Sequence, residues 1–329
     1  MNQEIQSEVA KLKQRKSDTP PAIEVRNLTK CYGDFKALDD LTFTVPAGVI
    51  CGFVGPNGSG KTTTMRILST LLKSNEGIAK VFDLDTHNLI DIKEVRHNIG
   101  YMPDYFGLYT DMTSSEYLEF FSAAYRIPAK KRHSLIDDIL TIIGLSDKKD
   151  TLIAGLSRGM QQRLSLGRCL VHSPKLLLLD EPASGLDPRA RIELMELLRE
   201  LKNMGKTILI SSHILSELHN LVDMVVIIES GKLIYSGTLE NASKQLRQGQ
   251  HFIELTIESD IDEAMASFKG LDEILDIRNQ GPVIYIEHSD NLSSADIIAF
   301  CYEKNIRLEE AKRSEARLEE IFMTLTQNK

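Results

Sequence analysis

A glycine-rich segment ahead of a lysine and a threonine is the first part of this sequence that could do chemistry. Residues Gly55–Thr62 fit the pattern glycine, four residues, glycine, lysine, threonine, in which backbone N–H groups surround phosphate oxygens. In such a loop, Lys61 would reach the β- and γ-phosphates and the Thr62 hydroxyl would bind Mg²⁺. The apolar run Val49–Val54 predicts a strand covered on both faces, and Lys61–Leu72 has helical character. A strand, a glycine loop and a helix in this order favour a phosphate loop over a plain glycine-rich turn.

Two adjacent carboxylates close a second apolar run. Asp180 and Glu181 follow Leu176–Leu179, which is typical of a short buried strand. A carboxylate at the carboxyl edge of a parallel sheet can orient Mg²⁺, so we assign Asp180 to the metal. We assign Glu181 to polarising the attacking water. Alone, this run could be a strand end and a turn; together with the phosphate loop it indicates nucleotide hydrolysis.

Composition limits the possible classes of protein. The chain has 329 residues, of which 42% are hydrophobic, and a formal net charge of −8, which argues against a broad nucleic-acid surface. The four cysteines have no metal or redox spacing and suit a reducing compartment. No apolar run approaches the roughly 20 residues of a membrane helix, and the N-terminus lacks the apolar run of a signal peptide. Residues 1–20 are expected to be a flexible tail or a short solvated helix, and any membrane role is expected to need a partner.

Apolar periodicity predicts the elements that surround these motifs. Further strands are expected at Ile23–Leu28, Leu41–Val45, Thr207–Ile210 and Val225–Ile228. Helices are expected over Ile192–Met204 and over most of 92–145. Strands that alternate with helices predict an α/β domain with a largely parallel sheet.

The character of the sequence changes near residue 240. Strands are expected at Phe252–Ile257 and Val283–Glu287, and helices at Ala295–Glu303 and Glu315–Thr326. We interpret residues 245–329 as a small α+β accessory domain, and it carries no recognisable chemical motif.

A short segment between the two motifs gives the sequence a family resemblance. Residues Leu156–Arg163 contain a serine, Ser157, that can cap a helix, and they lie between Lys61 and Asp180. This order resembles the nucleotide-binding domain of ABC transporters, and the match covers about residues 23–240. The resemblance implies a P-loop NTPase of the ABC type at 21–240, with a mostly parallel sheet, an antiparallel β part and a helical subdomain at about 92–170.

The resemblance also implies roles for individual residues. Tyr32 matches the aromatic that stacks on adenine, and His213 matches the switch histidine that senses the γ-phosphate. A lone histidine is more often structural, but His213 follows an apolar strand after the Asp-Glu pair. Thr62 and Asp180 match the Mg²⁺ ligands, and Lys61, Glu181 and His213 the catalytic set. The implied ATP contacts are Tyr32, Gly55, Pro56, Asn57, Gly58, Ser59, Gly60, Lys61, Thr62, Thr63, Ser157, Gly159 and Asp187.

The serine turn implies a second subunit. A capped helix start binds anions well, and in the family the anion at this turn is the γ-phosphate held by the opposite subunit. The loop Ser184–Asp187 matches the segment that contacts that subunit. The expected partners are therefore a second ATP-binding subunit, identical or related, and integral membrane subunits.

Two positions depart from the family pattern. In the serine turn, Arg158 and Met160 replace a glycine and a glutamine, while Ser157 and Gly159 are kept. Asp104 stands where the family usually has a glutamine that touches Mg²⁺ and the attacking water. Aspartate can still bind Mg²⁺, so Asp104 is a candidate metal ligand, and we expect altered coupling rather than inactivity.

Eight aromatic residues gather between 101 and 125. One interpretation is a locally aromatic core; the other is a groove that receives a helix of a membrane subunit. We expect both to hold in part, with Phe120 and Phe121 in the core. The eight are Tyr101, Tyr105, Phe106, Tyr109, Tyr117, Phe120, Phe121 and Tyr125.

Three hypotheses for the function remain. The leading one is an ATPase subunit that converts ATP and water to ADP and phosphate at the cytoplasmic face of the membrane and powers a separate membrane subunit. Ile99–Leu108 and Leu156–Gln161 look closer to exporter than to importer subunits. A soluble ABC ATPase acting on DNA or ribosomes should carry a coiled-coil insertion or a second phosphate loop, and neither is evident. A weakly catalytic assembly module is disfavoured by Glu181 and His213, but Asp104 leaves it open.

Overall fold

The chain divides into two compact units, Met1–Ser236 and Gly237–Lys329. The computed structural model describes residues 20–105, 107–213, 218, 221–238, 241, 250–268, 270–271, 273–289 and 291–313. The division falls near the change of character that the sequence predicts at residue 240. Residues 1–19 of the expected tail and the helix expected at Glu315–Thr326 lie outside the described residues. The two units are described separately below.

A six-stranded sheet forms the centre of the first unit, in the order β10-β9-β3-β8-β7-β6. The strands are β3 (Ile50–Val54), β6 (Ile99–Met102), β7 (Leu176–Leu179), β8 (Thr207–Ser212), β9 (Met224–Glu229) and β10 (Lys232–Thr238). Neighbours from β9 to β6 pair in parallel. Every residue of β3, β7 and β8 is buried, which explains why these strands are largely apolar on both faces.

The parallel pairing sets the position of the site. Parallel strands end at the same edge of a sheet, where α/β proteins bind ligands. The phosphate loop follows β3, Asp104 follows β6, Asp180 follows β7 and His213 follows β8. Four segments that are far apart in the sequence thus lie at one edge of the six-stranded sheet.

An antiparallel sheet packs beside this core, in the order β2-β1-β4-β5. It comprises β1 (Ile23–Tyr32), β2 (Phe35–Val45), β4 (Glu76–Val81) and β5 (Leu84–Asp85). Inward residues of β1 and β2 share one apolar cluster with β3 and with the helix α2 (Lys61–Leu68). The tight turn between β1 and β2 sets Tyr32 opposite Phe35.

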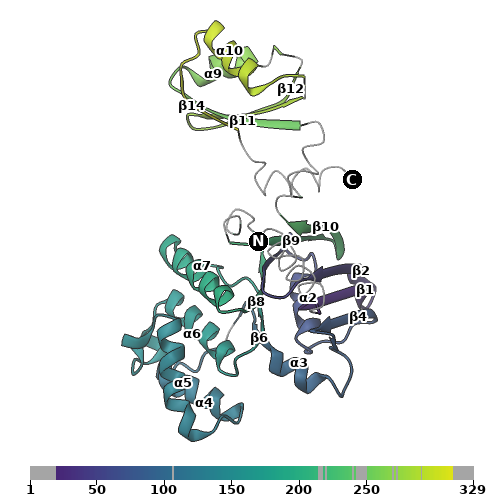
Figure 1. The fold of residues 1–329 in the computed structure, drawn as a ribbon, viewed down its shortest axis with the longest axis vertical. Coiled ribbons are helices and arrows are strands. Elements are labelled where there is room, and N and C mark those ends of the chain that lie inside the picture. Colours follow the sequence, from purple (N-terminus) through teal and green to yellow (C-terminus); the bar gives the residue numbers. More distant parts are fainter. Residues whose placement is uncertain are drawn as a thin grey trace, which may run out of the picture. The chain divides into compact units, whose positions relative to one another are not determined.

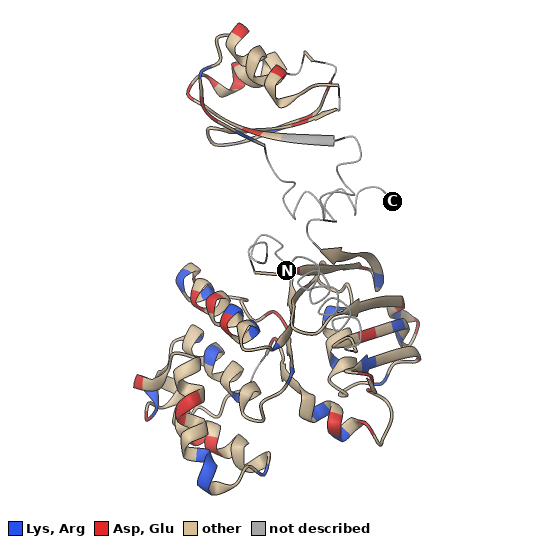
Figure 2. Cartoon of the chain, viewed as in Figure 1, with Lys and Arg blue, Asp and Glu red and all other residues tan. Residues whose placement is uncertain are grey.

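Helices complete the first unit (Figure 1). Besides α2 they are α3 (Ile92–Asn98), α4 (Ser114–Ala124), α5 (Ala129–Ile142), α6 (Arg158–Leu170) and α7 (Pro188–Asn203), with short 3-10 turns at Ser146–Lys148 and Ile153–Gly155. Helices α4, α5 and α6 pack on one another and form a helical group. Figure 2 shows both positively and negatively charged residues along α5 and α7. On α7, Arg189 Nε lies 3.2 Å from Glu193 Oε1.

Some elements differ from the sequence prediction. The prediction of mostly helix over 92–145 missed β6, because Gly100 interrupts its apolar residues, whereas β7 is an unbroken run of four leucines. Helix α2 ends at Leu68 rather than Leu72, since Thr70 adopts a positive φ of 63°. Helix α7 begins at Pro188, directly after its cap Asp187, rather than at Ile192.

The second unit has a single four-stranded antiparallel sheet, in the order β12-β13-β11-β14. Its elements are β11 (Gln250–Ile257), α9 (Ile261–Phe268), β12 (Ile274–Gln280), β13 (Val283–Ser289), α10 (Ser294–Glu303) and β14 (Leu308–Arg313). This succession and strand order define a ferredoxin-like unit. Buried residues of β11 and β13 pack against Phe268 and Ile297 of the two helices. The predicted strands at 252–257 and 283–287 and the helix at 295–303 are present, whereas α9, β12 and β14 were not predicted.

A capping box begins the helical group. Thr113 Oγ1 accepts from Glu116 N at 3.2 Å, and Glu116 Oε2 accepts from Thr113 N at 2.8 Å. We expect Thr113→Ala to lower the free energy of unfolding of the first unit by about 1 kcal/mol, because it removes the hydroxyl of the cap. Thr141→Ala, at an exposed position of α5, should change it by less than about 0.5 kcal/mol. Urea unfolding followed by circular dichroism measures both, and equal midpoints for the two variants would contradict the role of the cap.

Candidate active site

The phosphate loop connects β3 to α2 and is tightly packed. Gly60 has a φ of +106°, and a Cβ there would lie 2.5 Å from Leu38 Cδ2 and 2.8 Å from the Ala37 carbonyl oxygen. Lys61 is buried, and its Nζ donates to the carbonyl oxygens of Gly55 at 2.7 Å and Pro56 at 3.2 Å. These carbonyl groups hold the ammonium against the loop, where an anion in the loop can reach it.

A cavity of about 270 Å³ opens beside the loop. It brings together Tyr32, the loop, Asp104 and Glu181, four parts of the site that the sequence predicted separately. Its lining residues are Tyr32, Phe35, Ala37, Asn57, Gly58, Gly60, Lys61, Thr62, Thr63, Asp104 and Glu181. Sequence reasoning missed Phe35, although its pairing with Tyr32 across the hairpin follows from a two-residue turn.

The adjacent carboxylates take different positions. Asp180 is buried, and Ser211 Oγ donates to its Oδ1 at 2.7 Å. At Glu181 the chain turns, with a φ of +49°, and the Glu181 side chain reaches the cavity. The same Ser211 hydroxyl accepts from Glu181 N at 2.8 Å, so it positions both residues. Sequence reasoning missed Ser211, because only the pairing of β7 with β8 places it next to Asp180.

Glu181 lies between two basic side chains. Its Oε1 is 3.6 Å from Lys61 Nζ, and its Oε2 is 2.8 Å from His213 Nδ1. Because a carboxylate only accepts, Nδ1 carries a proton in this contact. Oε1 is buried and has no hydrogen-bond partner among the described residues. Among the described residues, Oε1 is therefore engaged only by its ion pair with Lys61.

Asp104 adds a third carboxylate to this edge. Burial raises the pKa of Asp104, and the charges of Asp180 and Glu181 raise it further, while Arg158 and His213 oppose the rise. Asp104 lines the same cavity as Thr62 and Glu181. Asp104 thus lies at the cavity, as predicted, with two other carboxylates near it.

The serine turn lies outside this cavity. Ser157 Oγ accepts from Met160 N at 3.3 Å, which confirms that it caps α6. Asp187 caps α7 in the same way, because its Oδ1 accepts from Ala190 N at 3.0 Å. A Cβ at Gly159 would lie 2.8 Å from Ala190 Cβ, so the two helix starts pack closely. In the described part of a single chain, Ser157, Gly159 and Asp187 do not line the cavity that contains Lys61.

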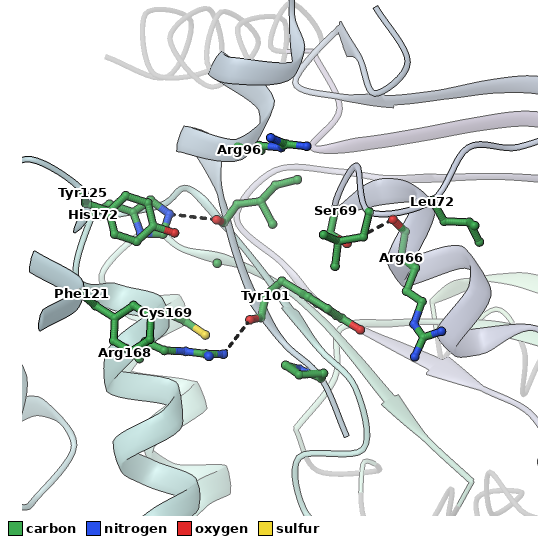
Figure 3. Close-up of a pocket in the computed structure, with 14 residues that line it drawn as sticks. Arg66, Ser69, Leu72, Arg96, Tyr101, Phe121, Tyr125, Arg168, Cys169 and His172 are labelled. Atoms are coloured by element: carbon green, nitrogen blue, oxygen red, sulfur yellow. Dashed lines mark hydrogen bonds between the residues drawn. The ribbon is translucent and has the colours of Figure 1, made fainter. Parts of the chain in front are cut away.

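The aromatic residues divide between the core and a second, larger cavity of about 770 Å³ (Figure 3). Tyr117 is fully buried and packs on Phe121, with ring centroids 5.0 Å apart. The prediction that Phe120 lies in the core is wrong, since it is 45% exposed at the surface of α4, and Phe121 lines the cavity. Tyr105 and Tyr109 are exposed, and Phe106 lies outside the described residues.

The wall of this second cavity is apolar and basic. Figure 3 shows Tyr125 stacked on His172, with centroids 4.0 Å apart, and Arg168 donating to the Tyr101 carbonyl oxygen at 3.3 Å. The full lining is Arg66, Ser69, Leu71, Leu72, Arg96, Ile99, Gly100, Tyr101, Pro103, Phe121, Tyr125, Arg168, Cys169 and His172.

Comparisons with known proteins identify the family. Residues 38–184 match the ABC transporter family. The chain is 30% identical to the uncharacterized ABC transporter ATP-binding protein YxlF of Bacillus subtilis, over 92% of this chain and 98% of that protein. It is 40% identical to the bacitracin transport ATP-binding protein BcrA of Bacillus licheniformis, over 70% of this chain and 74% of that protein.

Solved structures agree with this family assignment. An ATP-binding cassette of an ABC transporter in its ADP conformation matches with a TM-score of 0.60 and 27% identity, over 67% of this chain and 92% of that chain. A dimeric post-hydrolysis cassette bound to ADP and Pi matches with a TM-score of 0.59 and 25% identity, over 66% of this chain and 98% of that chain.

The chain belongs to the ATP-binding proteins of ABC transporters, and the predicted P-loop NTPase fold of the ABC type is confirmed. It is an ATP-driven transporter subunit, as the order of the motifs predicted. Within the described residues, no helix is both long and apolar enough to span a membrane.

The packing of the phosphate loop gives a test. We expect Gly60→Ala to weaken ATP binding at least tenfold, because the added Cβ meets the Ala37 carbonyl group and must distort the loop. Gly58→Ala is the matched control: its φ of +83° is also unfavourable for alanine, but nothing lies within 4 Å of the added Cβ. Titration with a fluorescent ATP analogue measures both affinities. Equal losses would mean that backbone strain, and not close packing, limits the loop.

Proposed function

We propose that this chain hydrolyses ATP at a site completed by a second chain, and that it drives export through separate membrane subunits. One observation carries the proposal: Lys61 and Glu181 share a cavity within one chain, whereas the capped turn at Ser157 lies outside it. A single chain therefore holds two halves of a phosphate site that do not meet.

The residues around the first cavity fit ATP and Mg²⁺. Gly55 and Gly60 leave no room for a side chain, so their backbone can approach phosphates closely. Buried Ser59 Oγ and Glu181 Oε1 have no hydrogen-bond partner among the described residues, as expected of groups that await a ligand. Thr62 and Asp180 would hold Mg²⁺, with Asp104 as a further ligand. When bound, Mg²⁺ neutralises the developing charge of the phosphoryl group.

Each side chain then has a distinct task. Tyr32 would stack on the adenine, and Lys61 would bind the outer phosphates. Glu181 would accept a hydrogen bond from the attacking water through Oε1, because Oε2 is engaged by His213. His213 would in turn respond to the γ-phosphate, since it lies at the end of β8 beside Glu181.

The second chain would contribute the start of α6. The cap leaves this helix end ordered, and the positive end of a 13-residue helix favours a phosphate. ATP would stabilise the dimer by binding both halves, and loss of the γ-phosphate would release it. The dimeric cassette with ADP and Pi among the structural relatives supports this arrangement. The partner is a second copy or a related chain.

Export is supported by the name of one relative, and transport by the name of another. Besides the bacitracin transport protein, the chain is 37% identical to the Nod factor export ATP-binding protein I of Rhizobium meliloti, over 66% of this chain and 64% of that protein. We propose that the chain works at the cytoplasmic face of the membrane. The second cavity, with exposed Leu71 and the nearby aromatic residues, would receive the membrane partner.

The role of Glu181 can be tested directly. We expect Glu181→Gln to lower the ATPase rate at least a hundredfold and to trap an ATP-bound dimer, because the amide is a poor proton acceptor. Light scattering after gel filtration with Mg-ATP would show the dimer, and Lys61→Ala, which should not bind ATP, is the control. Normal hydrolysis by Glu181→Gln would refute the assignment. A wild-type chain with no ATPase activity, alone or with its membrane partner, would favour a non-catalytic assembly module.

Cross-linking tests the membrane partner. In a Cys31→Ser background, a cysteine at Leu71 or Tyr109 should cross-link to a membrane protein in the assembled complex, because both residues are exposed at the proposed docking region. Met204→Cys is the control, because Met204 is 57% exposed at the C-terminal end of α7 and does not line this cavity. Adducts from all three positions, or from none, would count against docking at this cavity.

A further inference from the structure

The backbone that carries Glu181 adopts a conformation that its surroundings must support. Glu181 has a positive φ of 49°, and Pro182 follows it. A proline favours extended backbone at the residue before it, so this φ is unfavourable both for a glutamate and for a residue ahead of a proline. Glu181 N donates to Ser211 Oγ at 2.8 Å, and the Glu181 carbonyl oxygen accepts from Ser184 N at 3.0 Å. Pro182 is buried and next in the chain, so the partner of its carbonyl group also affects the position of Glu181.

Gln162 of α6 is that partner. Its Nε2 donates to the Pro182 carbonyl oxygen. Gln162 is 2% exposed, and among the described residues its side chain makes this hydrogen bond alone, because the buried Oε1 has no partner. A buried amide with an unpaired oxygen costs free energy that an apolar side chain of the same shape would not cost. The one contact of this amide is with the chain directly after the proposed catalytic glutamate.

The start of α6 packs on the same turn. Arg158 Nη2 donates to the Ser184 carbonyl oxygen at 3.2 Å. A Cβ at Gly185 would lie only 2.6 Å from Arg158 Cζ, so the guanidinium group lies against the glycine backbone. Ser157 caps this helix and is the residue proposed to meet the nucleotide of a second chain. Helix α6 therefore contacts the loop after Glu181 at more than one place and also carries the serine turn.

We propose that Gln162 is a positioning residue for Glu181: its amide fixes the Pro182 carbonyl group to α6 and thereby sets the backbone from which the glutamate reaches the cavity. The glutamate of one chain would then move together with the serine turn that the same chain offers to its partner. The inference rests on the proposed function and adds to it a residue that does not line the cavity of Lys61.

Matched substitutions at two neighbouring glutamines test the assignment on the full chain. Gln162→Met keeps a side chain of similar length and removes the amide. Gln161→Met is the control, because Gln161 Nε2 donates to the Ile153 carbonyl oxygen at 3.1 Å and not to the turn after Glu181. We expect Gln162→Met to lower kcat for Mg-ATP about tenfold and to leave ADP affinity within about twofold of the wild type, because the phosphate loop is untouched. Gln161→Met should leave both within about twofold.

The loss should act through Glu181. In the Glu181→Gln background, Gln162→Met should lower the residual single-turnover rate less than about twofold, because a positioning residue has no effect once the group it positions is gone. The double variant should also form the ATP-bound dimer as well as Glu181→Gln alone does. A tenfold loss in both backgrounds, or weaker dimer formation by the double variant, would mean that Gln162 supports α6 in general, and the assignment would be wrong.

Hydrogen–deuterium exchange measures the backbone without catalysis. In Gln162→Met, the amides of residues 180–186 should exchange about tenfold faster than in the wild type, while those of 163–170 in α6 stay unchanged. Gln161→Met should change neither segment. Unaltered protection at 180–186 would show that Gln162 does not hold this backbone. If the wild type hydrolyses no ATP, the proposed function fails, but the exchange measurement still decides whether Gln162 holds the backbone at Glu181.

Discussion

The parallel pairing of β3, β8, β7 and β6 is the constraint on which the site depends. These strands all end at the same edge of the sheet. The phosphate loop follows β3, His213 follows β8, the two adjacent carboxylates follow β7 and Asp104 follows β6. Because the strands are buried, their pairing is stabilised by apolar packing and not by the polar groups themselves. The fold can therefore hold several like charges together that would repel one another in a free loop.

Within this frame, hydrogen bonds set the finer geometry. One hydroxyl group, that of Ser211, contacts both Asp180 and the backbone of Glu181, while His213 orients the other side of the glutamate. Glu181 is held with a positive φ of 49°, an unfavourable backbone state for a glutamate that the surroundings must impose. Backbone strain of this kind clusters at functional sites, where the surrounding structure fixes the position of a side chain.

The second feature of the site is that its predicted parts do not all line one cavity in a single chain. The helix starts capped by Ser157 and Asp187 pack against each other, yet neither residue contributes to the cavity of its own chain. If a second chain completes the site, as we propose, ATP would favour association of the two chains by binding to both halves. The described residues of the ferredoxin-like second unit form an apolar core of their own and contain no recognised chemical motif.

The sequence by itself determined the P-loop NTPase fold and predicted the groups to which we assign the chemistry. A phosphate loop, an Asp-Glu pair after an apolar run and a serine turn between them are local patterns whose spacing is readable without coordinates. The pairing of β7 with β8 and the packing of α6 on the loop 184–187 are not local, so Ser211 beside Asp180 and Arg158 on Gly185 were decided only by the tertiary structure. The same holds for β6 and β14, because neither has a continuous apolar run and each owes its conformation to the strand it pairs with.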